Sequence, residues 1–220
     1  MRYLLRVNKM WWLFAAMAVA AAAAGARTPV GDFSRNSLEG WSEKVFEGNT
    51  QYDLKKEGGS TVLRAESRGT ASGLVKEIRV DLEQTPYLNW RWKIETPVSG
   101  DFVESHKSGD DYAARIYVIV SGGLAVWNTR ALNYVWARHA PEGTSWYNAY
   151  AGERAVMLAL RSSTDSVGAW QREKRNIRDD FLTHFNKKVR YIHAVALMSD
   201  TDNTGKHAVA WYGDIYFTKD

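Results

Sequence analysis

Apolar and polar residues alternate with a period of two along much of the chain. Residues 88–94 place leucine, two tryptophans and isoleucine on one face, and asparagine, arginine and lysine on the other. Residues 112–121 and 209–217 repeat this alternation, and turn sequences such as Gly48-Asn49 separate shorter segments of the same kind. Alternation is typical of strands that bury one face and expose the other. The pattern predicts roughly ten to twelve short β-strands.

Two segments depart from strict alternation. Residues 191–198 are apolar on both faces, which is typical of a central strand covered on both sides. In residues 177–186, apolar side chains recur at positions 177, 181, 182 and 185, the spacing of one helix face. Many short strands with one short helix near residues 177-186 predict an all-β fold, an antiparallel β-sandwich of the jelly-roll type.

The first 26 residues differ from the rest of the chain. Three basic residues precede the unbroken apolar run 10–24, and Ala24-Gly25-Ala26 offers the small residues that signal peptidase accepts. We therefore expect residues 1–26 to be a signal peptide and residues 27–220 to form a single β-sandwich domain. A retained anchor is the alternative, although the run is shorter than the roughly 20 residues of a membrane span. The mature protein is expected to be exported, periplasmic or secreted, with no stable membrane insertion after cleavage.

Composition excludes several classes of site. Cysteine is absent, so disulfides, a thiol nucleophile and thiolate metal sites are excluded. The formal net charge is +4, but three of the 29 basic residues and none of the 25 acidic residues lie in residues 1–26. The remaining chain is close to neutral. This balance gives no indication of nucleic-acid binding.

Cationic and aromatic residues at alternate strand positions are candidates for a ligand surface. If their strands are neighbours, they form one broad face, on which sugar rings stack on aromatic rings and guanidinium groups pair with carboxylates. Such a face suits an anionic polysaccharide. The alternative is that the aromatic side chains belong to the core and the cations are ordinary solvated charges. The candidate ligand-binding residues are Arg91, Lys93, Arg115, Tyr117, Tyr134 and Trp136.

Residues 200–205, Asp-Thr-Asp-Asn-Thr-Gly, resemble the opening of a calcium-binding loop. Asp200, Asp202 and Thr204 are the candidate calcium ligands. Position twelve of the loop is Trp211, where an EF-hand requires glutamate, so an EF-hand is excluded. A calcium loop of another type and a plain turn between two strands remain open.

A second polar cluster, residues 107–115, enters a predicted strand. Asp110 and Asp111 either ligate a cation or hold Arg115 and Lys107 in a structural ion-pair network, and the ion pair is the favoured interpretation. Because neighbouring residues of a strand point to opposite faces, alternation predicts that Asp111 shares the face of Arg115.

Motifs that are specific to a catalytic or cofactor site are missing from the sequence. It contains no nucleophile elbow, phosphate loop or dinucleotide fingerprint, and its five histidines are scattered. Glu173 and Asp180 offer a carboxylate pair, and a histidine or tyrosine with Arg115 offers the groups of a lyase. None of these has a spacing that demands catalysis.

Several short runs resemble one family in the same order along the chain. The chain resembles the 3047 family of domains of unknown function (DUF3047), which are exported bacterial proteins, and the resemblance extends from about residue 33 to residue 218. It implies no activity. A weaker resemblance, of architecture and of the final strand, is to carbohydrate-binding jelly-roll modules. The runs that carry the family resemblance are residues 71–74, 86–92, 109–112, 133–136, 200–203 and 212–217.

These observations lead to one main hypothesis and two alternatives. The main hypothesis is an exported, non-catalytic protein of the cell envelope that binds carbohydrate, with an anionic polysaccharide as ligand and calcium as its one candidate cofactor. The first alternative is a polysaccharide-acting enzyme, a lyase or a hydrolase, that uses acid and base residues on the same face. The second is an envelope scaffold that binds another protein.

Overall fold

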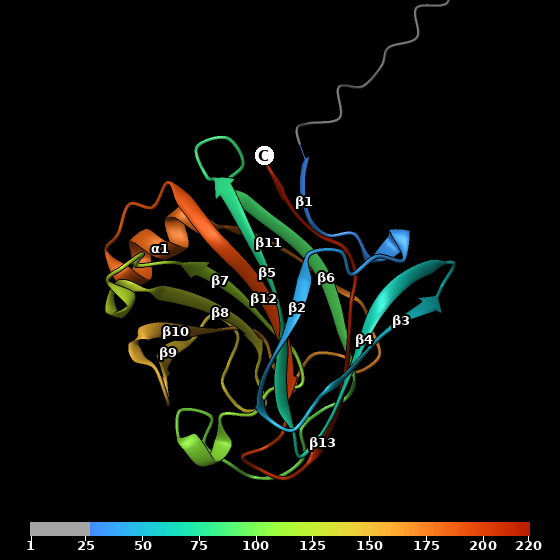
Figure 1. The fold of residues 1–220 in the computed structure, drawn as a ribbon. Helices are drawn as coiled ribbons and strands as arrows, with labels where there is room; N and C mark the ends of the chain where they lie inside the picture. Colours follow the sequence, from blue (N-terminus) through green and yellow to red (C-terminus); the bar gives the residue numbers. More distant parts are fainter. Residues whose placement is uncertain (1–26) are drawn as a thin grey trace, which may run out of the picture.

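Two β-sheets face each other across an apolar core in the computed structural model, which describes residues 27–220 (Figure 1). Sheet A contains, in spatial order, β1 (Arg27–Gly31), β14 (Ile215–Thr218), β6 (Tyr87–Thr96), β13 (His207–Tyr212), β4 (Ser60–Arg68) and β3 (Gln51–Glu57), with β11 (Gln171–Asn176) also paired to β6. Sheet B contains, in spatial order, β2 (Trp41–Glu47), β5 (Ala71–Asp81), β12 (Tyr191–Asp200), β7 (Arg115–Val120), β8 (Arg130–Trp136), β10 (Gly152–Arg161) and β9 (Ser145–Asn148).

The strands pair almost entirely in the antiparallel sense. In residues 27–220, β8 and β10 form the one parallel pair. β12, expected from its apolar sequence to be a central strand, lies between β5 and β7 and is antiparallel to both. The prediction of an all-β, jelly-roll-type antiparallel sandwich is therefore confirmed.

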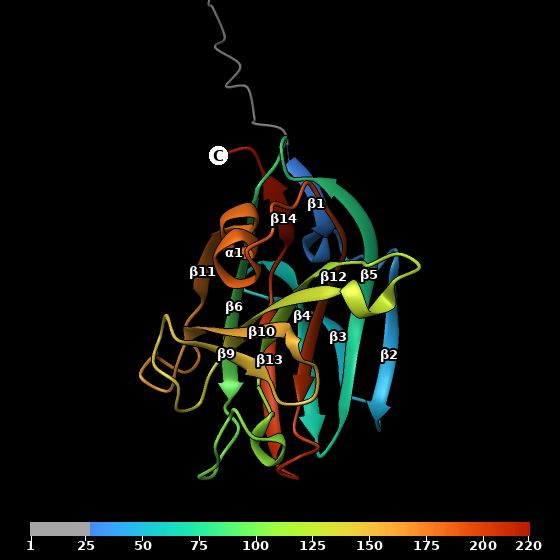
Figure 2. The same ribbon diagram turned by 90° about the vertical axis from the view of Figure 1, so that its left-hand side faces the viewer.

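One α-helix, α1 (Ile177–Phe185), occurs in the described part of the chain and follows β11 directly (Figure 2). The side chain of Asn176 accepts hydrogen bonds from the backbone N–H groups of residues 178 and 179, which caps the N-terminus. Asn186 ends the helix in the left-handed conformation, with φ 50°. The predicted helix is thus confirmed. Ile177 and Phe181 are fully buried and join the core.

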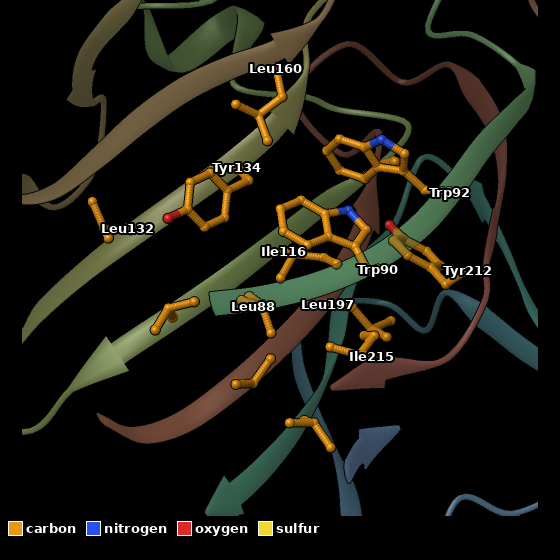
Figure 3. Packing of buried hydrophobic residues seen from close by; sticks show 14 of the residues in the cluster. Leu88, Trp90, Trp92, Ile116, Leu132, Tyr134, Leu160, Leu197, Tyr212 and Ile215 are labelled. Carbon is orange, nitrogen blue, oxygen red and sulfur yellow. The ribbon is translucent and has the colours of Figure 1, made fainter. Parts of the chain in front are cut away.

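Tryptophan and tyrosine side chains from both sheets form the centre of the core (Figure 3). The ring centroids of Trp90 and Tyr134 lie 5.4 Å apart, and those of Trp92 and Trp136 lie 5.9 Å apart. Trp90 and Trp92 come from β6 in sheet A, whereas Tyr134 and Trp136 come from β8 in sheet B. These contacts hold the two sheets face to face.

The prediction that Tyr134 and Trp136 belong to a ligand surface is wrong. Both side chains are buried between the sheets, where the Tyr134 hydroxyl donates to Asp180 Oδ2 at 2.6 Å and Trp136 Nε1 donates to the carbonyl of Ser162 at 3.0 Å. The strand register explains the error. Arg115 and Tyr117 of β7 stand opposite Val135 and Asn133 of β8, and directly opposed residues share a face. Tyr134 and Trp136 therefore point to the other face, which is the core.

Two predictions concern the N-terminal signal peptide and insertion into a membrane. The predicted signal peptide, residues 1–26, lies outside the described residues. No helix within residues 27–220 has the length and apolar character that crossing a bilayer requires.

Candidate functional site

A pocket of about 520 Å³ opens on the outer face of sheet B, the face turned away from sheet A. It lies beside the end of β12 and the beginnings of β5 and β7, with β8 and β10 next to them. We call it the sheet-B pocket. Its lining residues are Phe46, Glu47, Ala71, Asp110, Arg115, Tyr117, Ala131, Asn133, Asn148, Tyr150, Ala151, Ala155, Met198, Asp200, Asp202 and Asn203.

Small side chains form much of the floor of the sheet-B pocket. Ala71, Ala131 and Ala155 line it from three different strands. Ala196, directly opposite Tyr117, and Gly73, directly opposite Met198, continue this face. Because alanine and glycine barely project from a sheet, the floor lies below the larger side chains around it. The sequence therefore builds the hollow by placing small residues at outward positions.

Aromatic side chains stand around this floor. Tyr150, 56% exposed, and Phe46, 61% exposed, lie at the rim. The Tyr150 hydroxyl accepts a hydrogen bond from Asn203 Nδ2 at 2.9 Å, which fixes its ring relative to the loop after β12. Tyr117 is half-buried within the pocket, and its hydroxyl contacts the Met198 sulfur at 3.5 Å. The pocket thus presents ring faces to solvent at its edge and polar groups beneath them.

A buried guanidinium group, that of Arg115, is the positive charge of the pocket lining. It forms an ion pair with Asp200 and lies 3.7 Å from Asp110 Oδ1. Its Nε is buried without a hydrogen-bond partner among the described residues, and so is Oδ1 of Asn133, on the neighbouring strand. A buried polar atom without a partner loses the hydrogen bonds that water gives it in the unfolded chain. The pocket therefore contains one unused donor and one unused acceptor.

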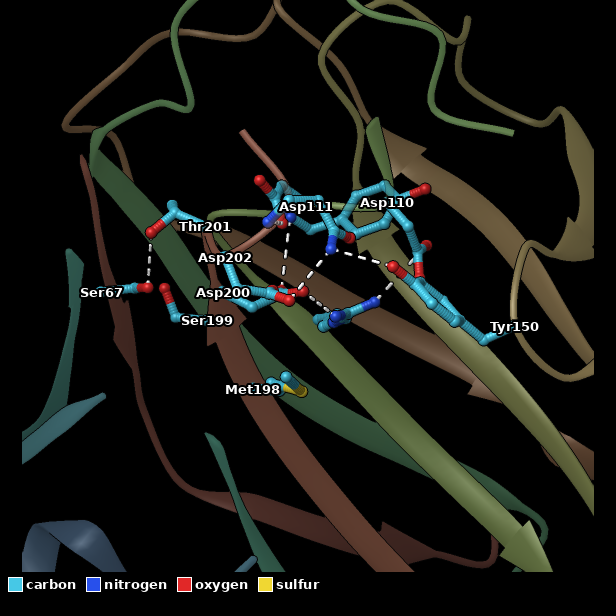
Figure 4. Close-up of polar contacts among 12 residues, drawn as sticks. Ser67, Asp110, Asp111, Tyr150, Met198, Ser199, Asp200, Thr201 and Asp202 are labelled. Atoms are coloured by element: carbon cyan, nitrogen blue, oxygen red, sulfur yellow. Dashed lines mark hydrogen bonds and ion pairs between the residues drawn. The ribbon is translucent and has the colours of Figure 1, made fainter. Parts of the chain in front are cut away.

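Four aspartates, which Figure 4 labels, gather beside Arg115. Carboxylate oxygens of Asp111, Asp200 and Asp202 lie within 4.8 Å of one another, and Asp110 adjoins them. Burial raises the pKa of Asp200, and the nearby carboxylates of Asp111 and Asp110 raise it further, against the opposing effect of Arg115. Burial is also the main cause of the raised pKa of Asp110 and of Asp202. These carboxyl groups consequently hold protons at higher pH than carboxyl groups in water do.

The structural ion pair predicted in residues 107–115 is present, but with a different aspartate. Arg115 pairs with Asp110, whereas Asp111 accepts from the backbone N–H groups of Asn203, at 3.2 Å, and Thr204, at 2.7 Å. The prediction that Asp111 shares the face of Arg115 fails because β7 begins only at Arg115. Alternation does not apply to the irregular segment before it.

The predicted calcium ligands are brought only partly together. Asp200 and Asp202 are close, but the third carboxylate beside them is that of Asp111, from the separate polar cluster in residues 107–115, and not an oxygen of Thr204. Oγ1 of Thr204 is buried and has no hydrogen-bond partner among the described residues. Asp200 is already paired with Arg115, which lowers the negative charge available to a cation. Calcium binding stays a prediction.

Arg91 and Lys93 lie far from Arg115 in the fold, because β6 belongs to sheet A and β7 to sheet B. Lys93 forms an ion pair with Glu57, and the Arg91 guanidinium lies 4.5 Å from the centroid of the Trp170 ring. Both residues are on the outer face of sheet A, since Trp90 and Trp92, which alternate with them along β6, point into the core. The prediction of one broad surface is therefore wrong. Of its six residues, Arg115 and Tyr117 alone lie in the sheet-B pocket.

Sequence reasoning missed several lining residues. Asn133 lies between core residues, and its outward direction follows only from the pairing of β8 with β7. Asn148 is the last residue of β9 and Tyr150 belongs to the turn after it, and Asn148 Nδ2 donates to Asp110 Oδ2 at 3.0 Å. No spacing in the sequence links this turn to residue 110. The sequence feature that could have indicated a hollow is the occurrence of glycine and alanine at strand positions that face outward.

Fold and pocket together define a jelly-roll β-sandwich protein with a ligand-sized hollow on the outer face of one sheet. More specifically, the chain belongs to DUF3047, a family of proteins of unknown function whose model matches residues 39–216. Among curated proteins, none matches this sequence.

Several solved structures are similar in fold. TmCBM61 in complex with β-1,4-galactotriose is 11% identical over 89% of this chain and 100% of that chain, with a TM-score of 0.42. The family 30 carbohydrate-binding module of a cellulosomal cellulase of Clostridium thermocellum is 11% identical over 82% of this chain and 92% of that chain, with a TM-score of 0.44. A cellulase derived from Cel12A of Rhodothermus marinus is 9% identical over 87% and 96%, with a TM-score of 0.46. At these identities the likeness says nothing about which residues bind a ligand.

Proposed function

We propose that this protein binds carbohydrate in the sheet-B pocket. One observation carries the proposal: a hollow of about 520 Å³ combines exposed aromatic rings with buried polar atoms that have no partner in the described chain. Its size is that of a pocket for a small organic ligand or a few sugar units. It lies on the outer face of a rigid sheet, where a polymer can reach it from solvent.

The chemistry of the lining matches that of a sugar. The C–H face of a pyranose ring packs against an aromatic ring, and its hydroxyl groups both donate and accept hydrogen bonds. A hydroxyl at the floor would accept from Nε of Arg115 and another would donate to Oδ1 of Asn133. Purely apolar ligands would leave both atoms unpaired, which costs about 1–3 kcal/mol for each.

The charges of the lining favour an uncharged glycan in this pocket. Glu47, Asp110, Asp200 and Asp202 are acidic, whereas Arg115 is the one basic residue among the lining residues, and it is already paired. An anionic sugar would meet more negative than positive charge. Carboxylates are, however, good acceptors for the hydroxyl groups of a neutral sugar. The anionic ligand predicted from the sequence stays a prediction, and titration with acidic oligosaccharides tests it alongside neutral ones.

Two tyrosines near the same turn provide a matched test. Tyr150 lines the pocket and is 56% exposed, whereas Tyr147, in β9, is 55% exposed and does not line it. Isothermal titration should use cellotetraose, xylotetraose and β-1,4-galactotetraose as neutral probes and tetragalacturonate as the acidic probe. For the neutral probes we expect Tyr150→Ala to weaken binding about tenfold, the loss of one stacking contact worth roughly 1.4 kcal/mol, and Tyr147→Ala to bind like the wild type.

The outcome can contradict the proposal in two ways. If no oligosaccharide of a broad neutral and acidic set binds the folded wild type, the protein does not use this pocket for sugars. If Tyr147→Ala and Tyr150→Ala lose affinity equally, binding occurs elsewhere on the molecule. Binding of a protein partner that depends on Tyr150 would favour the scaffold alternative instead.

A hydrolase is the second candidate function, because one observation favours it. Asp202 lines the pocket and has a raised pKa, and a protonated carboxyl beside a glycosidic oxygen can act as a general acid. Asp110, in the same lining, would then serve as the second carboxyl group. Prolonged incubation with the bound oligosaccharide, followed by chromatography, separates the two functions. Products that Asp202→Asn abolishes would establish hydrolysis, whereas an unchanged oligosaccharide supports binding alone.

We also propose that the protein acts outside the cytoplasm, in or near the cell envelope. What supports this is the sequence of residues 1–26, with basic residues before an apolar run and a small-residue cleavage site. A glycan ligand in the envelope would be accessible from that compartment.

A further inference from the structure

The outer face of sheet A contains a second hollow, of about 190 Å³, where three arginines converge. Arg27 comes from β1, Arg91 from β6 and Arg172 from β11, so residues far apart in the sequence meet there. The acidic residue of its lining is Asp214. We call this hollow the arginine pocket. It shares no lining residue with the sheet-B pocket, and nothing in the proposed function uses it.

Two of these arginines form an uncompensated pair of positive charges. Arg91 and Arg172 stand directly opposite each other in the antiparallel register of β6 and β11, an arrangement that like charges destabilise. Neither forms an ion pair with any described residue, whereas Asp214 is engaged by Arg27, at 3.5 Å, and by the hydroxyl of Ser34, at 2.6 Å. An anion between Arg91 and Arg172 would relieve their repulsion.

The side chain of Arg91 is held in place by its surroundings. A Cβ on Gly213 would lie 2.5 Å from Arg91 Cγ, so glycine at this position leaves the space across which the arginine extends. The guanidinium group then lies against the ring of Trp170. A guanidinium group fixed in this way is typical of a site that binds an anion.

We infer that the arginine pocket binds the carboxylate or sulfate group of an acidic glycan. The guanidinium groups of Arg91 and Arg172 can each donate two hydrogen bonds to such a group. The hydroxyls of Ser60 and Thr61, also in the lining, suit the neighbouring sugar hydroxyls. An extended nucleic acid is disfavoured, because Glu57 and Glu95 lie along β3 and β6 of the same sheet and interrupt its positive charge.

Titration of the purified protein with three polymers tests this inference. Polygalacturonate carries carboxylates, dextran sulfate carries sulfates, and plain dextran is the uncharged control. We expect one or both acidic polymers to bind, with affinity that falls as salt is added. Arg172→Ala should weaken this binding about tenfold. Arg91→Lys, which keeps the charge but loses the planar fork, should also weaken it.

Matched variants separate a specific site from general attraction. Arg178, an exposed arginine of α1, lies outside both pockets, and Arg178→Ala should keep wild-type affinity within twofold. Equal losses for Arg172→Ala and Arg178→Ala would overturn the inference, as would tighter binding of single-stranded DNA than of either acidic polymer. Tyr150→Ala should leave binding of the acidic polymers unchanged. Failure of the sheet-B pocket to bind sugars would therefore be distinguishable from failure here.

Discussion

Removing the guanidinium group of Arg115 should destabilise the protein more than the loss of its ion pair with Asp200 alone suggests. Arg115 is 4% exposed and Asp200 is 1% exposed, so neither charge is solvated by bulk water. The substitution Arg115→Met keeps much of the side-chain length but leaves the buried carboxyl groups of Asp200 and Asp110 without their counter-charge. Removing one partner of a buried ion pair lowers the free energy of unfolding by about 3–5 kcal/mol. For a chain of this size, each kcal/mol lowers the Tm by about 2–4 °C, so a fall of roughly 6–20 °C is expected.

The pH dependence of this loss follows from the raised pKa of Asp200. Arg115 is the group that opposes the effect of burial on that pKa, so its removal raises the pKa further. A carboxyl group whose pKa is higher in the folded than in the unfolded state stabilises the fold at low pH. That stability is lost as the pH rises above about 4, the unfolded value, and through the folded value. The deficit of Arg115→Met should therefore be smaller at pH 5 than at pH 8.

Calorimetric melting at several pH values measures both effects. Arg115→Met/Asp200→Asn, which removes the charge of both partners, should recover part of the lost stability. Arg190→Met is the matched control, because Arg190 pairs with Asp81 at 3.1 Å on the exposed surface, and we expect it to change the Tm far less. If Arg115→Met and Arg190→Met lower the Tm equally, or if the Arg115→Met deficit grows toward acid pH, the reasoning about buried charge is refuted.

Three other predictions can be tested directly. Trp136→Ala should lower the free energy of unfolding by about 3–5 kcal/mol, since the ring is core; urea unfolding showing a change below about 1 kcal/mol would contradict its placement. If calcium binds beside Asp111 and Asp202, a hundredfold excess over Kd should add about 2.7 kcal/mol of stability, seen as a Tm that EDTA lowers. Asp202→Asn should abolish that sensitivity, and a wild-type Tm unaffected by chelation excludes calcium. Mass spectrometry of exported protein should find a chain beginning at Arg27, whereas an intact Met1 would contradict cleavage.

Strand alternation predicted the fold well where one face of a strand is clearly apolar. In β6 the large aromatic residues occupy every second position, so Trp90 and Trp92 could be assigned to the core. In β8, Leu132, Tyr134 and Trp136 share the core face, but Val135 on the other face is buried as well, in a second apolar cluster with Met157. Because residues on both faces of β8 are buried, the polar neighbours of its aromatic residues did not reveal which face is the core.

The candidate site was less predictable than the fold, because it depends on strand order. Arg115 and Asp200 are 85 positions apart in the sequence and meet because β7 pairs with β12. Arg91 and Arg115 are only 24 positions apart but lie on different sheets. Residue types and local spacing contain no information about such pairings. An ion pair within residues 107–115 was predictable because its partners lie in one short segment, but the choice of Asp110 over Asp111 was not.

The pairing of β1 with β14 has a practical consequence for attaching the protein to a solid support. Arg27 stands opposite Thr218, and Thr218 stands opposite Tyr87, so both described ends of the chain emerge at the same edge of the sandwich. The end of β12 lies toward the opposite end of the sandwich (Figure 1), and the residues there, Met198 and Asp200, line the sheet-B pocket. A bead, sensor surface or fused carrier attached at either end would therefore leave the pocket pointing outward. Both orientations of attachment should give equal capture of the same ligand from solution.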